Sequence, residues 1–150
     1  MDYIEVVKTL IQKNISIATA ESITGGLISK MITDVAGSSA ILKESFVVYS
    51  NEAKVDILGV DKSIIERYGV VSKEVAKEMA IKLYDKTKRN VCISTTGNAG
   101  PTVCDDKPVG RVYVGIVVDG VTETYECNFD GDRNSIRCQT ANFVFGKLGN

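Results

Sequence analysis

Histidine is absent from this chain of 150 residues. Without it, Ser-His-Asp and Cys-His catalysis within one chain are excluded, and so are metal sites that use histidine as a ligand. Any proton transfer must therefore rely on Lys, Tyr, Asp, Glu or Cys side chains.

The sequence also lacks long apolar runs and an excess of charge of either sign. No run approaches the length that spans a bilayer, and the acidic first residues, Met1 to Glu5, do not resemble a signal peptide. We therefore expect a cytoplasmic protein without a membrane partner. The net charge of −1 and the pI of about 5.5 provide no basic patch for phosphates, so we expect no nucleic-acid partner.

Cysteines are few and dispersed. None of the four forms the close pair that is typical of a zinc knuckle or a redox motif: Cys92, Cys104, Cys127 and Cys138. In a cytoplasmic chain they are expected to be reduced thiols.

The residues that are present indicate an ordinary globular domain. Hydrophobic residues make up 44% of the chain and charged residues 25%, so one domain over residues 1–150 with a sizeable core is expected. Apolar periodicity predicts helices near 4–11, 24–34, 51–59 and 62–69, after Ser72, and over 133–148. It predicts strands near 15–20, 45–50 and 90–97, and a hairpin of 110–119 and 122–129 across Gly120. This order favours a three-layer α/β/α sandwich with a mixed sheet.

Three polar loops follow predicted strands, and ligands of open α/β sheets bind beyond the carboxyl ends of strands. The loops are Glu21 to Gly26, Tyr49 to Lys54 and Thr96 to Pro101. We expect them to line one pocket.

The first loop, in "ATAESITGG", ends in Gly25 and Gly26 at a predicted helix start. Such a start can present backbone N–H groups to an anion, assisted by the helix dipole. The alternative is a capped helix start whose glycines permit close packing. The loop matches neither the Walker nor the dinucleotide pattern.

Lys54 is the candidate base, since a buried lysine can be neutral near physiological pH and can activate a serine. A solvated surface charge is the ordinary alternative for Lys54, and a core aromatic is the alternative for Tyr49. Ser39, in "DVAGSSA", is either a nucleophile within reach of Lys54 and Tyr49 or part of a helix-capping turn. Spacing alone does not choose between these interpretations.

Together these segments resemble the C-terminal domain of the competence/damage-inducible CinA family, including its stand-alone nicotinamide-nucleotide amidases. The matching stretches include "TAESITGG", "ITDVAGSSA", "FVVYSNEAKVDILGV", "TTGNAGP", "KPVGRVYVGI" and "FDGDRNSIR". The resemblance implies a homodimer or higher homo-oligomer that converts nicotinamide mononucleotide, a pyridine nucleotide, to nicotinate mononucleotide and ammonia without metal or cofactor.

The resemblance also implies roles for individual residues. Ser39 corresponds to the nucleophile, and Tyr49 and Lys54 to its proton-transfer partners; whether Ser39 or Ser22 is acylated stays open. The substrate-binding set comprises Glu21, Ser22, Thr24, Gly25, Gly26, Asn51, Thr96, Gly97, Gly100 and Arg133.

The chain departs from the family pattern at Ile23, where cysteine is usual, at Asn98, where isoleucine is usual, and in the loop 102–107. That loop lacks the glycine pair that the family tends to carry, and Asp105 and Asp106 would repel a phosphate if they faced the pocket. Two hypotheses follow: an active amidase, or a nucleotide-binding or assembly module in which the loop blocks the pocket and turnover is lost.

Overall fold

A mixed five-stranded sheet forms the centre of the computed structural model, which describes residues 2–150. The strands lie in the order β2-β1-β3-β4-β5. Their bounds are β1 Ile17–Glu21, β2 Leu42–Val47, β3 Val91–Gly97, β4 Arg111–Val118 and β5 Val121–Asn128. Strand β1 pairs in parallel with β2 and β3, whereas β4 is antiparallel to both β3 and β5. The carboxyl ends of β1, β2 and β3 therefore meet at one edge of the sheet.

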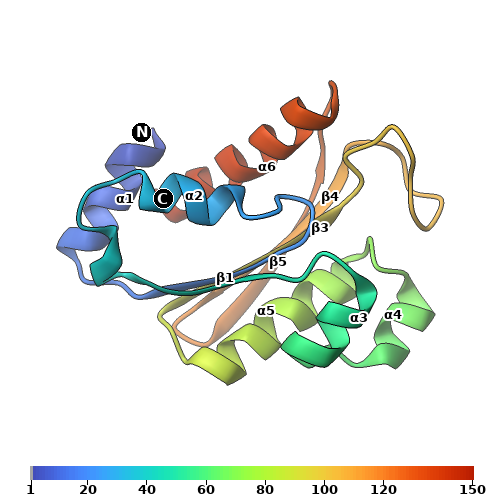
Figure 1. The fold of residues 1–150 in the computed structure, drawn as a ribbon, viewed down its shortest axis with the longest axis horizontal. Helices are drawn as coiled ribbons and strands as arrows, with labels where there is room; N and C mark the ends of the chain where they lie inside the picture. Colours follow the sequence, from blue (N-terminus) through green and yellow to red (C-terminus); the bar gives the residue numbers. More distant parts are fainter. Residues whose placement is uncertain (1) are drawn as a thin grey trace.

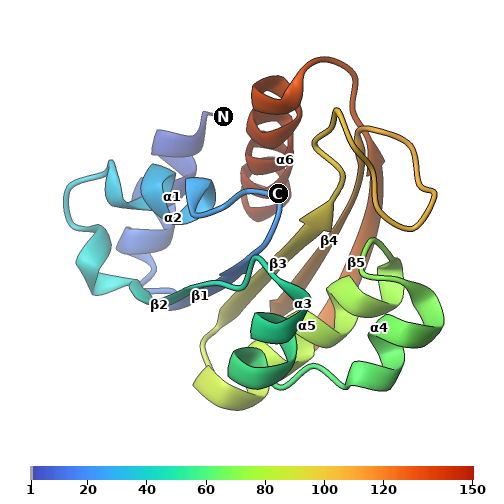
Figure 2. The ribbon, with the colours of Figure 1, turned by 45° about the vertical axis from the view of Figure 1, so that its right-hand side comes forward.

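Helices cover both faces of the sheet (Figures 1 and 2). One face carries α1 (Tyr3–Gln12), α2 (Leu27–Thr33) and α6 (Arg133–Leu148). The other carries α3 (Asn51–Ala53), the π-helical turn η2 (Lys54–Leu58), α4 (Lys62–Tyr68) and α5 (Lys73–Thr87). A short 3-10 helix, η1 (Ser38–Ala40), leads into β2. The predicted α/β/α sandwich with a mixed sheet is confirmed.

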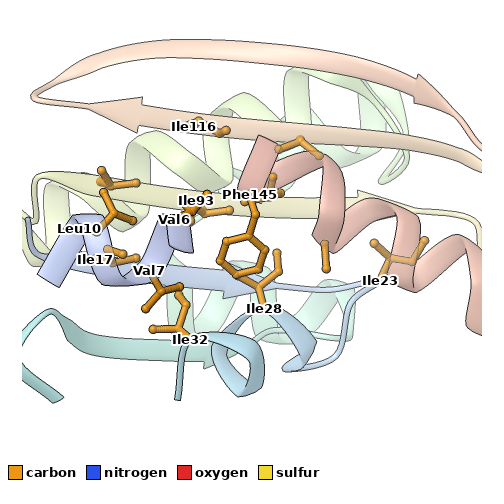
Figure 3. Close-up of a cluster of buried hydrophobic side chains, with 14 of the residues drawn as sticks. Val6, Val7, Leu10, Ile17, Ile23, Ile28, Ile32, Ile93, Ile116 and Phe145 are labelled. Carbon is orange, nitrogen blue, oxygen red and sulfur yellow. The ribbon is translucent and has the colours of Figure 1, made fainter. Parts of the chain in front are cut away.

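Each face of the sheet has its own apolar core. Aliphatic side chains from α1, α2 and α6 pack on β1, β3 and β4 in the first core, where Figure 3 places Val7, Ile28, Ile93 and Phe145 close together. In the second core, Val75, Met79 and Leu83 of α5 pack against the opposite face. These α5 residues recur at helical spacing, which explains why the sequence predicted this helix correctly.

Local sequence rules set several boundaries as expected. Ser72 caps α5, because its side chain accepts a hydrogen bond from the N–H of Val75. The predicted hairpin also occurs, with Val118 paired to Val121. Asp119 and Gly120, at φ 48° and 84°, supply the left-handed conformations that a two-residue hairpin turn requires.

Strand β2 was predicted three residues too late. It spans Leu42–Val47, because it pairs with β1 from Leu42 onward, opposite Ile17. The next residues leave the sheet, and the Ser50 side chain caps α3 by accepting from the N–H of Ala53. The helix predicted over 51–59 begins at Asn51 and widens into the π-helical turn η2 from Lys54.

The packing of α5 on the sheet can be tested with two glycine substitutions. A Cβ on Gly115 of β4 would lie 2.6 Å from both the Ala76 carbonyl oxygen and the Ser94 hydroxyl, whereas a Cβ on Gly146 of α6 would contact nothing within 4 Å. We expect Gly115→Ala to lower the free energy of unfolding by about 1–3 kcal/mol through overpacking. Gly146→Ala should be neutral or raise it by up to about 1 kcal/mol. Urea unfolding measures both, and equal values would contradict this packing.

Candidate functional site

A cavity of about 220 Å³ lies at the carboxyl ends of β1, β2 and β3, where the three predicted loops meet. Of the predicted site residues, the structure brings together at its lining Ser22, Tyr49, Asn51, Lys54, Thr96, Gly97, Gly100 and Arg133. The convergence follows from topology, since parallel neighbouring strands end at the same edge of a sheet.

The centre of the site is a contact between a lysine and a serine. The Lys54 Nζ donates a hydrogen bond to Ser22 Oγ at 3.0 Å and a longer one to the Tyr49 carbonyl oxygen at 3.4 Å. Lys54 is only 1% exposed, although the three-residue helix α3 is the only helical turn between it and the exposed end of β2, Val47. Its position at the start of the π-helical turn η2 carries its side chain inward, toward the end of β1.

Burial controls the protonation of this lysine. It lowers the pKa of Lys54 from 10.5 to about 8, an effect that nearby Cys104 and Glu52 partly offset. Among residues 2–150 no carboxylate forms an ion pair with Lys54. A neutral amine is therefore accessible near physiological pH, within hydrogen-bond distance of a serine hydroxyl.

Arg133 and Tyr49 form one side of the cavity mouth. The Arg133 guanidinium donates to the Gly100 carbonyl oxygen at 2.8 Å and to the Tyr49 hydroxyl at 2.9 Å. Tyr49 is 61% exposed, and in the described part of the chain its hydroxyl makes no hydrogen bond to Lys54 or Ser22. The phenol thus lies at the entrance, and only the Tyr49 backbone contacts the buried amine.

The predicted anion site at the start of α2 is wrong. The carboxylate of Glu21 occupies this position: it accepts from the N–H groups of Ile28 and Ser29 at 2.9 and 3.1 Å and from the Ser29 hydroxyl at 2.6 Å. A negative charge already satisfies the helix terminus, so a second anion would be repelled. Glu21, Gly25 and Gly26 do not line the cavity.

Thr24 is also structural in this chain. Its hydroxyl is buried and lies 2.9 Å from the hydroxyl of Thr95, away from the cavity lining. The turn around it is held by Arg137, which donates to the carbonyl oxygens of Ile23 and Thr24 at 3.1 and 3.0 Å. Sequence reasoning did not single out Arg137, whose contacts cross more than a hundred residues of chain.

Ser39 does not meet Lys54 and Tyr49, so the prediction that they lie within reach of one another is wrong within one chain. Ser39 belongs to η1, which precedes β2, whereas Tyr49 and Lys54 follow it. The six residues of β2 separate these segments by about 20 Å. In Figure 1 the segment before β2 and helix α3 lie at opposite ends of the sheet.

Part of the cavity wall was missed because it comes from elsewhere in the chain. Val70 and Val71, in the connection between α4 and α5, line the cavity, and the Thr96 hydroxyl donates to the Val70 carbonyl oxygen at 2.8 Å. Asn98, from the third predicted loop, and Thr102 and Cys104, from the loop 102–107, complete this wall. No local periodicity indicates such contacts.

The altered loop 102–107 borders the cavity without filling it. Thr102 and Cys104 lie at the lining, whereas Asp105 and Asp106 do not. The Asp105 carboxylate is directed to the Val71 N–H, from which it accepts at 2.9 Å. The pocket is therefore open in this structure, contrary to what the blocked-module hypothesis expects.

Residues 2–150 contain no group of three or more Cys, Asp or Glu side chains arranged to hold a metal ion. They also contain no helix with the length and apolar character needed to cross a membrane.

Comparison with known proteins identifies the family. The sequence model of the CinA C-terminal domain matches residues 3–150. The chain belongs to the CinA C-terminal domain family. Curated relatives that bear the name competence-damage inducible protein include one from Halothermothrix orenii, 47% identical over 94% of this chain, and one from Thermoanaerobacter pseudethanolicus, 49% identical over 91%. This CinA-type chain matches 35% and 33% of those two proteins, so it spans about a third of their length.

Solved structures of CinA-type proteins have the same fold. The competence/damage inducible protein from Agrobacterium tumefaciens aligns with a TM-score of 0.91 at 34% identity, covering 99% of this chain and 94% of that one. The competence or damage-inducible protein from Enterobacter asburiae aligns with a TM-score of 0.93 at 31% identity, covering 99% and 96%.

The capping role of Glu21 in this CinA domain can be tested by Glu21→Gln. The amide keeps one acceptor oxygen but places an N–H₂ group against backbone donors, so we expect the free energy of unfolding to fall by about 1–3 kcal/mol. Glu66→Gln is the control. The Glu66 side chain is 66% exposed and its ion pair with Lys62 is long, at 3.8 Å, so removing this charge should change the free energy of unfolding by less than about 0.5 kcal/mol. Urea titration measures both, and a Glu21→Gln effect no larger than the control would refute the capping role.

Proposed function

We propose that this protein is an amidase that hydrolyses the carboxamide of nicotinamide mononucleotide to nicotinate mononucleotide and ammonia, without a metal. The observation that carries the proposal is the buried Lys54 amine within 3.0 Å of Ser22 Oγ at the lining of a cavity. In a chain without histidine, a neutral lysine beside a serine is a chemically sound way to generate an alkoxide nucleophile.

In the first half-reaction Ser22 Oγ attacks the carboxamide carbon while the neutral Lys54 amine accepts the hydroxyl proton. The carbonyl oxygen becomes an oxyanion, to which we assign the backbone N–H of Ile23, next to the nucleophile at the cavity wall. The Lys54 ammonium then returns its proton to the leaving nitrogen. Ammonia departs, and Ser22 carries the acyl group as an ester.

In the second half-reaction water attacks the ester, and Lys54 again accepts the proton. Collapse of the second tetrahedral intermediate breaks the bond to Ser22 Oγ, which recovers its proton from Lys54. The net reaction consumes one water and the carboxamide and yields the carboxylic acid, ionised at neutral pH, and ammonia. This scheme assigns the acylated residue to Ser22 rather than Ser39, because only Ser22 contacts the buried amine.

The dimensions and polarity of the cavity support a ligand with a flat head and an anionic tail. Its volume of about 220 Å³ is smaller than the roughly 300–1,000 Å³ of sites that enclose drug-sized ligands, so it suits a pyridine carboxamide ring rather than a whole nucleotide. The remainder would extend past the mouth, where Arg133 can bind a phosphate. Tyr49 would orient the ligand there rather than transfer protons.

The alternative is a binding or assembly module whose pocket is blocked by loop 102–107. No contact of this loop supports that alternative, because the loop leaves Ser22 and Lys54 at the lining of an open cavity. The homodimer, the cytoplasmic location and the absence of nucleic-acid and membrane partners stay predictions.

Ammonia release from nicotinamide mononucleotide, with chelator present, tests the reaction. We expect turnover by the unmodified protein and a loss of at least about a thousandfold in Ser22→Ala and in Lys54→Ala. Ser39→Ala is the matched control, since it removes an exposed serine hydroxyl outside the cavity lining, and it should retain activity. Activity that survives Ser22→Ala but disappears in Ser39→Ala would reverse the assignment of the nucleophile.

The pH dependence provides a separate test of Lys54. Because the neutral amine is the base, kcat/KM should rise about tenfold per pH unit below pH 8 and level off above it, matching the pKa of about 8. Glu52 helps to keep this pKa from falling further, so Glu52→Gln should move the inflection to lower pH. A flat profile between pH 6 and 9 would exclude Lys54 as the base.

A further inference from the structure

A backbone donor next to the proposed nucleophile has no partner. Ile23 follows Ser22 and is only 5% exposed, yet within residues 2–150 its N–H donates to no acceptor. Buried N–H groups in native proteins are nearly always hydrogen-bonded, so a free one beside a cavity points to a role toward a ligand. The Ile23 side chain packs in the apolar core beside α6 (Figure 3), although the residue also borders the cavity. Its backbone therefore forms this part of the wall.

The hydrogen bond of the preceding carbonyl sets the direction of this N–H. The Ser22 carbonyl oxygen, in the same peptide group as the Ile23 N–H, accepts from the Gly25 N–H at 3.1 Å. The C=O and N–H bonds of a trans peptide point in opposite directions, so the Ile23 N–H points away from Gly25. The Ser22 N–H is already used, since it donates to the carbonyl and hydroxyl oxygens of Thr95, both at 3.2 Å. Of these two N–H groups, only that of Ile23 is free to bind an oxyanion.

Arg137 of α6 holds the other side of Ile23. Its Nε donates to the Ile23 carbonyl oxygen at 3.1 Å, and its Nη2 donates to the Thr24 carbonyl oxygen at 3.0 Å. The Thr24 carbonyl has a second donor, the Leu27 N–H, whereas in the described part of the chain the Ile23 carbonyl has Arg137 alone. The orientation of the peptide group that follows Ile23 therefore depends on this guanidinium.

Gly25 leaves room for the guanidinium. A Cβ at this position would lie 3.3 Å from Arg137 Nη2, and Gly25 has φ 58°, so glycine permits both the turn and the close approach of Arg137. No carboxylate forms an ion pair with Arg137 among residues 2–150. The guanidinium is thus directed to the two carbonyl oxygens of the turn.

We propose that Arg137 is a positioning residue for the amidase reaction, because it holds the Ile23 N–H in the orientation that binds the oxyanion. The inference rests on the proposed function and adds to it a residue outside the cavity. The substrate oxygen becomes negatively charged only when Ser22 Oγ adds to the carboxamide carbon, and a donor fixed in advance stabilises that charge without reorganisation. Without Arg137 the Ile23 carbonyl has no donor, and the turn is free to rotate this N–H away. Arg137 therefore acts on the transition state rather than on substrate binding.

The kinetic test is Arg137→Met, which keeps the aliphatic stem and removes both donors. We expect kcat for nicotinamide mononucleotide to fall at least about tenfold and KM to stay within about twofold, because the lost interaction is made only in the transition state. Arg137→Lys restores one donor and should recover part of the loss. If the methionine variant does not fold, the lysine variant should show the same split to a smaller extent.

Arg67→Met is the matched control for this substitution. Arg67 is an exposed residue of α4, makes no side-chain hydrogen bond within residues 2–150, and lies outside the cavity lining. Its replacement should leave kcat and KM within about twofold of the unmodified protein. A rise of KM with unchanged kcat in Arg137→Met would overturn the proposal.

A probe that mimics the tetrahedral intermediate tests Arg137 without turnover. The trigonal boron of pyridine-3-boronic acid accepts an electron pair from Ser22 Oγ, whose proton passes to Lys54, and the adduct is a tetrahedral boronate with one negative charge. Nicotinamide occupies the same cavity without that charge. The calorimetric Kd of the boronic acid should rise at least about tenfold in Arg137→Met, while that of nicotinamide stays within about twofold. Equal changes for both ligands would overturn the proposal, because Arg137 would then only maintain the shape of the cavity.

Failure of the proposed function is distinguishable from failure of this inference. If the unmodified protein releases no ammonia but forms the boronate adduct, and Ser22→Ala abolishes the adduct, the amidase proposal fails and the two calorimetric constants alone decide on Arg137. A selective loss of boronic acid affinity in Arg137→Met would still support it as the residue that positions the oxyanion donor. An unchanged ratio of the two constants, or no binding of the boronic acid to the unmodified protein, would overturn it.

Discussion

The burial of one amine governs the arrangement of this site. Lys54 is almost fully removed from solvent, yet its Nζ meets only a serine hydroxyl and a backbone carbonyl oxygen. A protonated ammonium is poorly stabilised in such surroundings, so burial lowers the pKa of Lys54 to about 8 and makes the neutral amine more accessible than in an exposed lysine. The end of β2, the Ser50 cap and the π-helical turn all serve to place this amine next to the end of β1.

The carboxylate of Glu21 lies at the same end of β1 as Ser22, but it does not raise the pKa of Lys54, because it faces away from the amine. Glu21 is adjacent to Ser22 in sequence, but its charge is satisfied by the backbone of α2, on the other face of the sheet. Neighbouring residues of an extended chain point to opposite sides, so one strand end can cap a helix and present a hydroxyl at once. Had Glu21 faced Lys54, an ion pair would have kept the lysine protonated.

Much of the fold could be predicted from the sequence, because its helices and strands have clear apolar periodicity. The predicted bounds of α6 match those in the structure, and the hairpin across Gly120 was predicted correctly. The convergence of Ser22, Lys54 and Thr96 was predicted from the rule that ligands of open α/β sheets bind beyond the carboxyl ends of strands. Ser39 was misplaced because sequence spacing does not say at which end of β2 a neighbouring segment lies. The anion site failed because the occupant of the α2 terminus, Glu21, lies in the preceding strand. Val71 and Arg137 were missed because their contacts are long-range.

Two hydrogen bonds connect loop 102–107 to the backbone of Val71: Asp105 accepts from the Val71 N–H, and the Lys107 Nζ donates to the Val71 carbonyl oxygen. They limit which changes of sequence this loop can tolerate. Since Val71 is 1% exposed, shortening the loop or shifting its register would leave two backbone groups without partners in a place that excludes water. The loop and the α4–α5 connection therefore depend on each other structurally, so a change in one requires a matching change in the other, although some thirty residues separate them. Anyone who grafts this loop onto another scaffold must transfer the segment around Val71 with it.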